Sequence, residues 1–192
     1  NLRDWMRPKN VGSPLPMIGS RSYIEYESKG VCLILSPWNF PLNLTFGPLV
    51  SAIAAGNCCI LKPSEATPAT SQVMQEIVSS LFDPAEVVLV QGEVETAQAL
   101  LELPFHHIFF TGSPAVGRIV MQAASRNLSS VTLELGGKSP AFVDGTASMK
   151  TTAQRLAWGK CLNAGQICVA PDYVLVTEEA RDPLAEALKK QL

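Results

Sequence analysis

Short apolar runs alternate with longer stretches of helical periodicity over most of this chain. The first run, residues 31–35, is continuously apolar and is bounded by Gly30 and by a Ser-Pro pair, as is typical of a parallel strand buried on both faces. Further strands are expected at residues 58–61, 86–90, 107–110 and 131–135, and helical periodicity predicts helices at residues 42–55, 67–81, 94–101 and 113–124. This alternation predicts an α/β fold with a doubly wound parallel sheet. The loops that follow the strands should then lie at one edge of the sheet, where ligands usually bind.

The pattern changes on both sides of this layer. Residues 1–20 are rich in proline and glycine, and residues 22–27 alternate like an exposed strand that has no hairpin partner of equal length nearby. After residue 136 the pattern predicts strands at 141–143 and 172–177 and helices at 149–163 and 181–191. We therefore expect three parts, formed by residues 1–30, 31–135 and 136–192, the last being the start of a second α/β domain.

Composition narrows the possible functions. The chain has 192 residues, of which 47% are hydrophobic and 17% charged, with a formal net charge of −2. No run of Lys or Arg occurs, so a nucleic-acid partner is not expected. The apolar runs are broken before membrane-spanning length, and residues 1–5 do not resemble a signal peptide. Free cysteines without an export signal favour the cytoplasm. The chain does not begin with Met, so we expect processing or a start inside a longer protein.

Cys168 is the candidate nucleophile. The chain has five cysteines, and four of them lie among apolar neighbours that favour a place in the core. Only Cys168 follows a turn of small and polar residues, 163–167, that would expose its sulfur. A free cysteine is nevertheless more often a buried packing residue. His106 and His107 have no partners at metal-ligand spacing, so we expect no metal site and assign both to the structure.

Two predicted loops carry side chains that suit a ligand. Asn39 lies between two prolines that restrict the backbone, so its amide would point in a fixed direction and could donate to an oxyanion. Lys62 and Glu65 follow the next strand, where they could hold the hydroxyls of a ribose. Taken singly, each set is better explained by an ordinary turn.

The last two loops suggest phosphate binding and proton transfer. Gly112 and Ser113 precede a predicted helix that contains Gly117, and the amino end of such a helix attracts phosphate. Glu134 points away from the face that its apolar neighbours share and lies at the end of its strand, where it could act as a general base. The alternatives are an ordinary helix cap and a surface glutamate.

Taken together, these segments resemble the aldehyde dehydrogenase superfamily. The resemblance spans nearly the whole chain and rests on five segments in their order along the sequence: residues 37–41, 62–65, 110–117, 133–140 and 165–168. The run Ala-Pro-Asp-Tyr at residues 170–173 is similar to the class 3, fatty-aldehyde-type branch. The resemblance implies a Rossmann-like NAD-binding layer at 31–135, the start of a catalytic domain at 136–192, and an oligomerisation-type strand within 1–30.

The resemblance also implies roles. Cys168 would attack an aldehyde to give a thiohemiacetal, and Asn39 would hold its oxyanion. Loss of hydride to NAD⁺ or NADP⁺ would leave a thioester, and Glu134 would activate the water that hydrolyses it to a carboxylic acid. The residues expected to bind the cofactor are Pro37, Trp38, Lys62, Glu65, Gly92, Gly112, Ser113, Gly117 and Leu135.

The chain departs from the family in its length. Members continue well beyond residue 192, so we expect a truncated fragment of an enzyme that, at full length, is a homo-oligomer, a dimer, acting on a small-molecule aldehyde. Two alternatives remain open. The chain could be an inactive remnant that only binds dinucleotide or associates, or it could belong to a relative that passes the acyl group to coenzyme A. Glu134 favours hydrolysis over the second alternative.

Overall fold

The structure is a computed structural model, and it describes residues 2–191. The chain divides between Glu134 and Leu135 into two compact units, each of which is described by itself.

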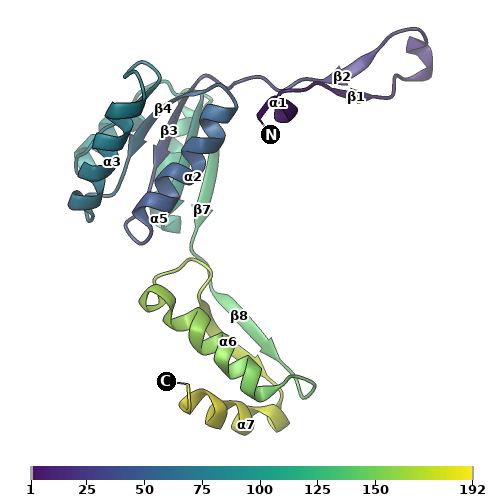
Figure 1. The fold of residues 1–192 in the computed structure, drawn as a ribbon, viewed down its shortest axis with the longest axis vertical. Helices are drawn as coiled ribbons and strands as arrows, with labels where there is room; N and C mark the ends of the chain where they lie inside the picture. The colour runs from purple at the N-terminus through teal and green to yellow at the C-terminus, as the bar shows by residue number, and fades with distance from the viewer. Residues whose placement is uncertain (1, 192) are drawn as a thin grey trace. The chain divides into compact units, whose positions relative to one another are not determined.

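A five-stranded sheet with the strand order β5-β4-β3-β6-β7 is the centre of the first unit (Figure 1). Its strands are β3 (Val31–Leu35), β4 (Cys58–Lys62), β5 (Val87–Leu89), β6 (His107–Gly112) and β7 (Ser130–Leu135). The pairs β3–β4, β3–β6 and β4–β5 are parallel, and Leu35 lies opposite both Lys62 and Phe110. The prediction of an α/β fold with a parallel sheet is confirmed.

Four helices connect these strands: α2 (Pro41–Ala54), α3 (Pro68–Leu81), α4 (Val94–Leu101) and α5 (Pro114–Ser125). Helix α2 contacts α3, and α4 contacts α5. The chain runs outward from β3 to β5 and then in the opposite direction from β6 to β7, so right-handed crossovers place the two helix pairs on opposite faces of the sheet. The sheet is therefore doubly wound.

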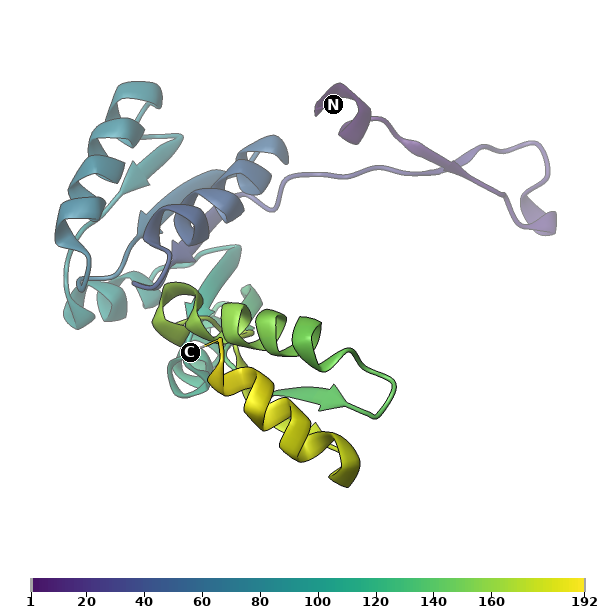
Figure 2. The same cartoon turned by 60° about the horizontal axis from the view of Figure 1, so that its bottom comes forward.

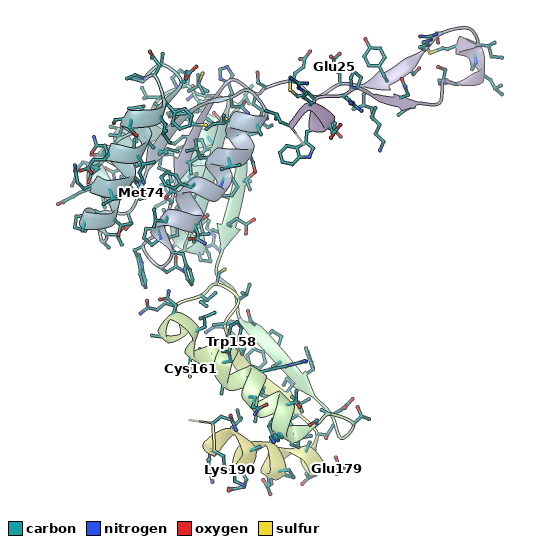
Figure 3. All side chains as sticks on the ribbon, in the orientation of Figure 1. Glu25, Met74, Trp158, Cys161, Glu179 and Lys190 are labelled. Atoms are coloured by element: carbon teal, nitrogen blue, oxygen red, sulfur yellow. The ribbon has the colours of Figure 1, made fainter. Side chains whose placement is uncertain are left out.

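Apolar side chains between the sheet and α2 and α3 form the main core. Leu61 of β4 and Met74 of α3 are fully buried, and Figure 3 labels Met74 on its helix. The other members of this cluster are Cys32, Ile34, Leu49, Cys59, Val78, Val87 and Leu89. Because both faces of the central strands are covered, these strands are continuous apolar runs in the sequence.

The segment before the sheet contains α1 (Leu2–Trp5), β1 (Lys9–Val11), the 3₁₀ turn η1 (Leu15–Met17) and β2 (Ser22–Ile24). Strands β1 and β2 pair antiparallel, with Lys9 opposite Ile24. The expectation that the strand at 22–27 lacks a nearby hairpin partner was therefore wrong. Its partner is only three residues long, all of them exposed, and so has no apolar alternation to reveal it.

The second unit is a small α/β layer (Figure 2). Strands β8 (Ser139–Val143) and β9 (Pro171–Val176) pair in parallel and are connected through α6 (Met149–Cys161) and the 3₁₀ turn η2 (Leu162–Gly165); α7 (Glu178–Lys189) follows. Val143, Ala153 and Leu184 form its buried core. Within residues 2–191, no helix combines the length and the apolar character needed to cross a membrane.

Candidate functional site

The candidate residues of the first unit follow the carboxyl edge of its sheet. Parallel strands end at the same edge, so the strand order arranges the loops after β5, β4, β3, β6 and β7 in that sequence along it. The winding reverses between β3 and β6, which is where doubly wound folds bind their ligands. The loop that carries Asn39 follows β3, and the loop that carries Ser113 follows β6, so these two loops flank the reversal.

The loop after β3 is anchored by two buried hydroxyl groups that the sequence analysis did not identify. Ser36 is 7% exposed and Thr45, in α2, is fully buried. The Ser36 Oγ lies 2.5 Å from the Thr45 Oγ1, and the Thr45 hydroxyl donates to the Pro41 carbonyl at 2.6 Å. Between these anchors, Asn39 is half-buried. Thr45, a polar residue in the largely apolar sequence of α2, was the available signal.

The neighbouring residues Pro37 and Trp38 differ in exposure. Pro37 is half-buried, whereas 49% of Trp38 is exposed. A large aromatic side chain left open beside the carboxyl edge of the sheet suits contact with a bound group.

A cavity of about 180 Å³ lies between the loops that follow β4 and β5. Glu65 and Gly92 both line it, together with Pro63, Ser64, Pro68, Ser71, Gln91 and Glu93. Lys62 is 5% exposed; its Nζ donates to the Pro63 carbonyl at 3.1 Å and lies 3.5 Å from the Glu65 Oε2. The Glu65 carboxylate thus lies beside the Lys62 ammonium at this cavity, where it can accept hydrogen bonds from the vicinal hydroxyls of a sugar.

The amino end of α5 has fewer free donors than the sequence suggested. The Ser113 hydroxyl accepts a hydrogen bond from the Val116 N–H at 3.3 Å, and the Gly117 N–H donates to the Ser113 carbonyl at 2.9 Å. Pro114 has no N–H to donate. The helix dipole remains available to a phosphate. At Gly112 a β-carbon would lie 2.5 Å from the Phe110 ring, so a larger residue would have to displace this buried side chain.

Glu134 is the second-last residue of strand β7. Val131 and Leu133 are half-buried, whereas Glu134 is exposed. Leu135 is the last residue of the strand. The carboxylate is thus accessible to water at the carboxyl end of the strand.

In the second unit, Cys168 follows a turn with unusual backbone geometry. Asn163, Ala164 and Gly165 have φ angles of 49°, 54° and 78°, so three successive residues are left-handed. A residue with a β-carbon is strained there by about 1–2 kcal/mol, and such strain often occurs at functional sites. Cys168 itself is exposed.

Of the other four cysteines, which were predicted to lie in the core, three are buried or partly buried and one is exposed. Cys32 and Cys59 are buried, opposite each other on β3 and β4, and Cys58 is partly buried. A hydrogen bond with Cys32, followed by burial, raises the pKa of the Cys59 thiol, which favours a protonated packing residue. Cys161, however, is exposed at the end of α6 (Figure 3), so the expectation of a core position was wrong for this residue. It lies in the last turn of a helix whose only buried residues are Ala153 and Ala157.

An ion pair connects the segments on either side of the Cys168 turn. The Lys138 Nζ lies 2.9 Å from the Asp172 Oδ2. Asp172 is the extra residue of a bulge, because Ser139 pairs with Pro171 but Pro140 with Tyr173. The hydrogen bond from Lys138 and the charge of Lys138, followed by the charge of Lys160, lower the pKa of Asp172. The Lys138 side chain is 83% exposed and the Asp172 side chain 33%, so solvent screens the pair and it orients the segments more than it stabilises the fold.

Replacing Gly165 with alanine should destabilise this turn. The residue has a φ of 78°, and an added β-carbon would lie 3.0 Å from the Lys160 carbonyl oxygen. We expect the free energy of unfolding to fall by roughly 1–3 kcal/mol, as measured by urea denaturation. Gly145→Ala is the matched control, because nothing lies within 4 Å of a β-carbon at that position. Equal stability of the two variants would contradict the argument.

The histidines belong to the opposite, amino edge of the sheet. The Val31 N–H donates to the His106 Nδ1 at 3.0 Å. His107 lies between Ser130 and Thr132, with its Nδ1 and Nε2 at 2.8 and 3.1 Å from their hydroxyl oxygens. Burial, followed by the charge of Lys29, lowers the pKa of His107. Across residues 2–191 no group of three or more His, Cys, Asp or Glu side chains is placed to hold a metal ion.

A doubly wound parallel sheet whose carboxyl edge carries a cavity, a helix amino end and a carboxylate is typical of dinucleotide-binding proteins. Comparison with known proteins narrows this class. The model of the aldehyde dehydrogenase family matches residues 6–192. The chain therefore belongs to the aldehyde dehydrogenase family.

Individual relatives agree with this assignment. The chain is 50% identical over 191 residues to 4,4'-diaponeurosporen-aldehyde dehydrogenase of Staphylococcus aureus, covering 100% of this chain and 42% of that protein. It is 48% identical over 192 residues to aldehyde dehydrogenase family 3 member B1 of Bos taurus, covering 100% of this chain and 41% of that protein. The chain thus spans about 41–42% of the length of these curated relatives.

Solved structures share the fold. The substrate-bound state of Staphylococcus aureus AldH superposes with a TM-score of 0.95 at 49% identity, covering 98% of this chain and 41% of that chain. A Mycobacterium tuberculosis aldehyde dehydrogenase complexed with NAD⁺ superposes with a TM-score of 0.86 at 31% identity, covering 96% of this chain and 38% of that one. Membership of the family, predicted from five motifs, is confirmed.

Proposed function

We propose that the protein containing this chain oxidises an aldehyde to a carboxylic acid with NAD⁺ or NADP⁺, using Cys168 as nucleophile. The observation that carries this proposal is the family match over residues 6–192, the range in which Asn39, Glu134 and Cys168 lie. Exposure of Cys168 after a strained turn is consistent with the role.

The chemistry assigns one task to each residue. The Cys168 sulfur adds to the aldehyde carbon, and the oxygen that becomes negative accepts a hydrogen bond from the Asn39 amide. The nicotinamide cofactor, when bound, supplies the acceptor for the hydride that leaves this carbon. Glu134 then takes a proton from water as the water attacks the resulting thioester, which releases the carboxylic acid and returns the thiol.

We propose that the cofactor binds along the carboxyl edge of the first unit. We propose that Lys62 and Glu65 hold the adenosine ribose at the 180 Å³ cavity that Gly92 also lines. The pyrophosphate would then lie near Gly112, Ser113 and Gly117, attracted by the dipole of α5. The remaining proposed contacts to the nicotinamide half are Pro37, Trp38 and Leu135. The related enzyme from Mycobacterium tuberculosis was solved with NAD⁺.

A charge change at Glu65 should alter the choice between NAD⁺ and NADP⁺. The carboxylate repels a 2′-phosphate on the ribose that it binds, so we expect Glu65→Gln to raise the ratio of kcat/KM for NADP⁺ over NAD⁺ by about 10-fold. Glu86→Gln removes a carboxylate at the amino end of β5 and should leave the ratio unchanged. An unaltered ratio in Glu65→Gln would show that the residue does not contact the ribose.

The proposed function is tested on the intact polypeptide that contains this chain. NADH formation is followed with a medium-chain aldehyde such as octanal, and NAD⁺ binding is measured separately by calorimetry. Aldehyde-dependent NADH formation with release of the acid supports the proposal. Binding of NAD⁺ without turnover would instead select the inactive remnant.

We further propose that the full-length protein is a homo-oligomer, a dimer. The motivation is the pair of short exposed strands β1 and β2, which leave backbone groups at their edges for another chain. Light scattering of the intact protein decides this, and a monomer at all concentrations would contradict it.

A further inference from the structure

A buried chain of hydroxyl groups lies directly under the loop that carries Asn39. We propose that Thr45 is a positioning residue, which holds the Asn39 amide at the place where the oxyanion forms. This inference rests on the proposed function, in which Asn39 is the oxyanion donor.

The direction of each hydrogen bond in this chain follows from the number of protons. Thr45 has one hydroxyl proton, and its Oγ1 lies 2.6 Å from the Pro41 carbonyl, which can only accept. The proton of the 2.5 Å contact between Ser36 and Thr45 must therefore come from Ser36. The order Ser36 to Thr45 to the Pro41 carbonyl leaves one arrangement for both hydroxyl groups.

This arrangement connects both ends of the Asn39 loop to one rigid side chain. Ser36 is the first residue after β3, and Pro41 is the first residue of α2. The Ser36 N–H also donates to the Lys62 carbonyl at 3.1 Å, which attaches the start of the loop to the neighbouring strand. Asn39 lies between the two anchored ends, so a shift of either end would move its amide.

Burial makes the arrangement sensitive to substitution. Ser36 is 7% exposed and Thr45 is 0% exposed, so water cannot replace a lost partner. A threonine in a helix commonly bonds to the carbonyl four residues earlier, and that contact alone would be ordinary. The second, buried contact to Ser36 is what connects α2 to the loop after β3.

The experiment compares variants of the intact enzyme. Thr45→Val removes the hydroxyl at nearly constant volume, and we expect kcat to fall about 10-fold with an unchanged Kd for NAD⁺, because small misplacements of a catalytic group have effects of this size. Thr45→Ser keeps the hydroxyl and should remain within about 2-fold of wild type. In an Asn39→Ala background, Thr45→Val should cause no further loss of kcat, because Thr45 acts only through Asn39.

A double variant separates positioning from folding. Thr45→Val leaves the Ser36 hydroxyl buried without an acceptor, whereas Ser36→Ala combined with Thr45→Val removes both polar groups. We expect the double variant to recover thermal stability but not kcat. Recovery of both would show that Thr45 serves the fold alone and would overturn the inference.

The remaining outcomes are also decisive. If the wild type is active and Thr45→Val has the same kcat, this inference is overturned while the proposed function stands. A loss in Thr45→Val that is equally large in the Asn39→Ala background overturns it too, because Thr45 would then act elsewhere. A wild type without aldehyde-dependent NADH formation overturns the proposed function, and this inference with it.

Discussion

Replacing Cys168 with alanine is expected to reduce aldehyde-dependent NADH formation by about 10⁴-fold or more, while NAD⁺ binding is retained. Loss of a covalent nucleophile removes the thiohemiacetal from which hydride departs, and no neighbouring group can replace the sulfur. The proposed cofactor contacts other than Leu135 lie in the first unit, away from the substituted position in the chain. NADH formation should therefore be lost while NAD⁺ binding persists. Steady-state absorbance measures NADH formation, and calorimetry measures NAD⁺ binding.

Cys161 offers a matched control for this experiment. It is exposed in the same unit, on the other side of the left-handed turn at residues 163–165. Cys161→Ala should change kcat by less than about 2-fold, because it does not take part in the proposed chemistry. Substantial turnover in Cys168→Ala, or a comparable loss in Cys161→Ala, would show that the nucleophile has been assigned to the wrong residue.

Replacing Glu134 with glutamine has the second largest expected effect. We expect steady-state kcat to fall by about 10²–10⁴-fold, which is the usual contribution of a general base. Since hydride transfer precedes the step that needs this base, a burst of about one equivalent of NADH should remain. Stopped-flow absorbance detects the burst, and mass spectrometry of the quenched protein detects an acyl group on Cys168.

The same variant distinguishes hydrolysis from acyl transfer to coenzyme A. If the thioester is normally passed to coenzyme A, then Glu134→Gln should leave the rate with coenzyme A unchanged. Glu95→Gln removes another exposed carboxylate, in the first turn of α4, and serves as the control. If Glu134→Gln abolished the NADH burst as well as steady-state turnover, Glu134 would act at or before hydride transfer. That result would contradict its role as the base for hydrolysis.

Local signals in the sequence were sufficient for most of the fold. Continuous apolar runs predicted β3, β4 and β6 because strands buried on both faces have no polar side chains to interrupt them. Exposed elements gave weaker signals. Strand β1 was missed because its three exposed residues show no apolar pattern. Cys161 was placed in the core because apolar neighbours in the sequence do not show which side chains the fold covers.

The identity of the candidate residues was likewise a property of the sequence, because motif order along the chain singled out Asn39, Glu134 and Cys168. What holds these residues was decided by tertiary structure. Strand order arranges the loops along one edge, the buried hydroxyls of Ser36 and Thr45 anchor the Asn39 loop, and Asp172 enters a bulge that directs it to Lys138. Such contacts depend on backbone geometry and on which side chains the fold buries. A periodic pattern along the chain reveals which face of an element is apolar, but not which polar groups meet once that face is covered.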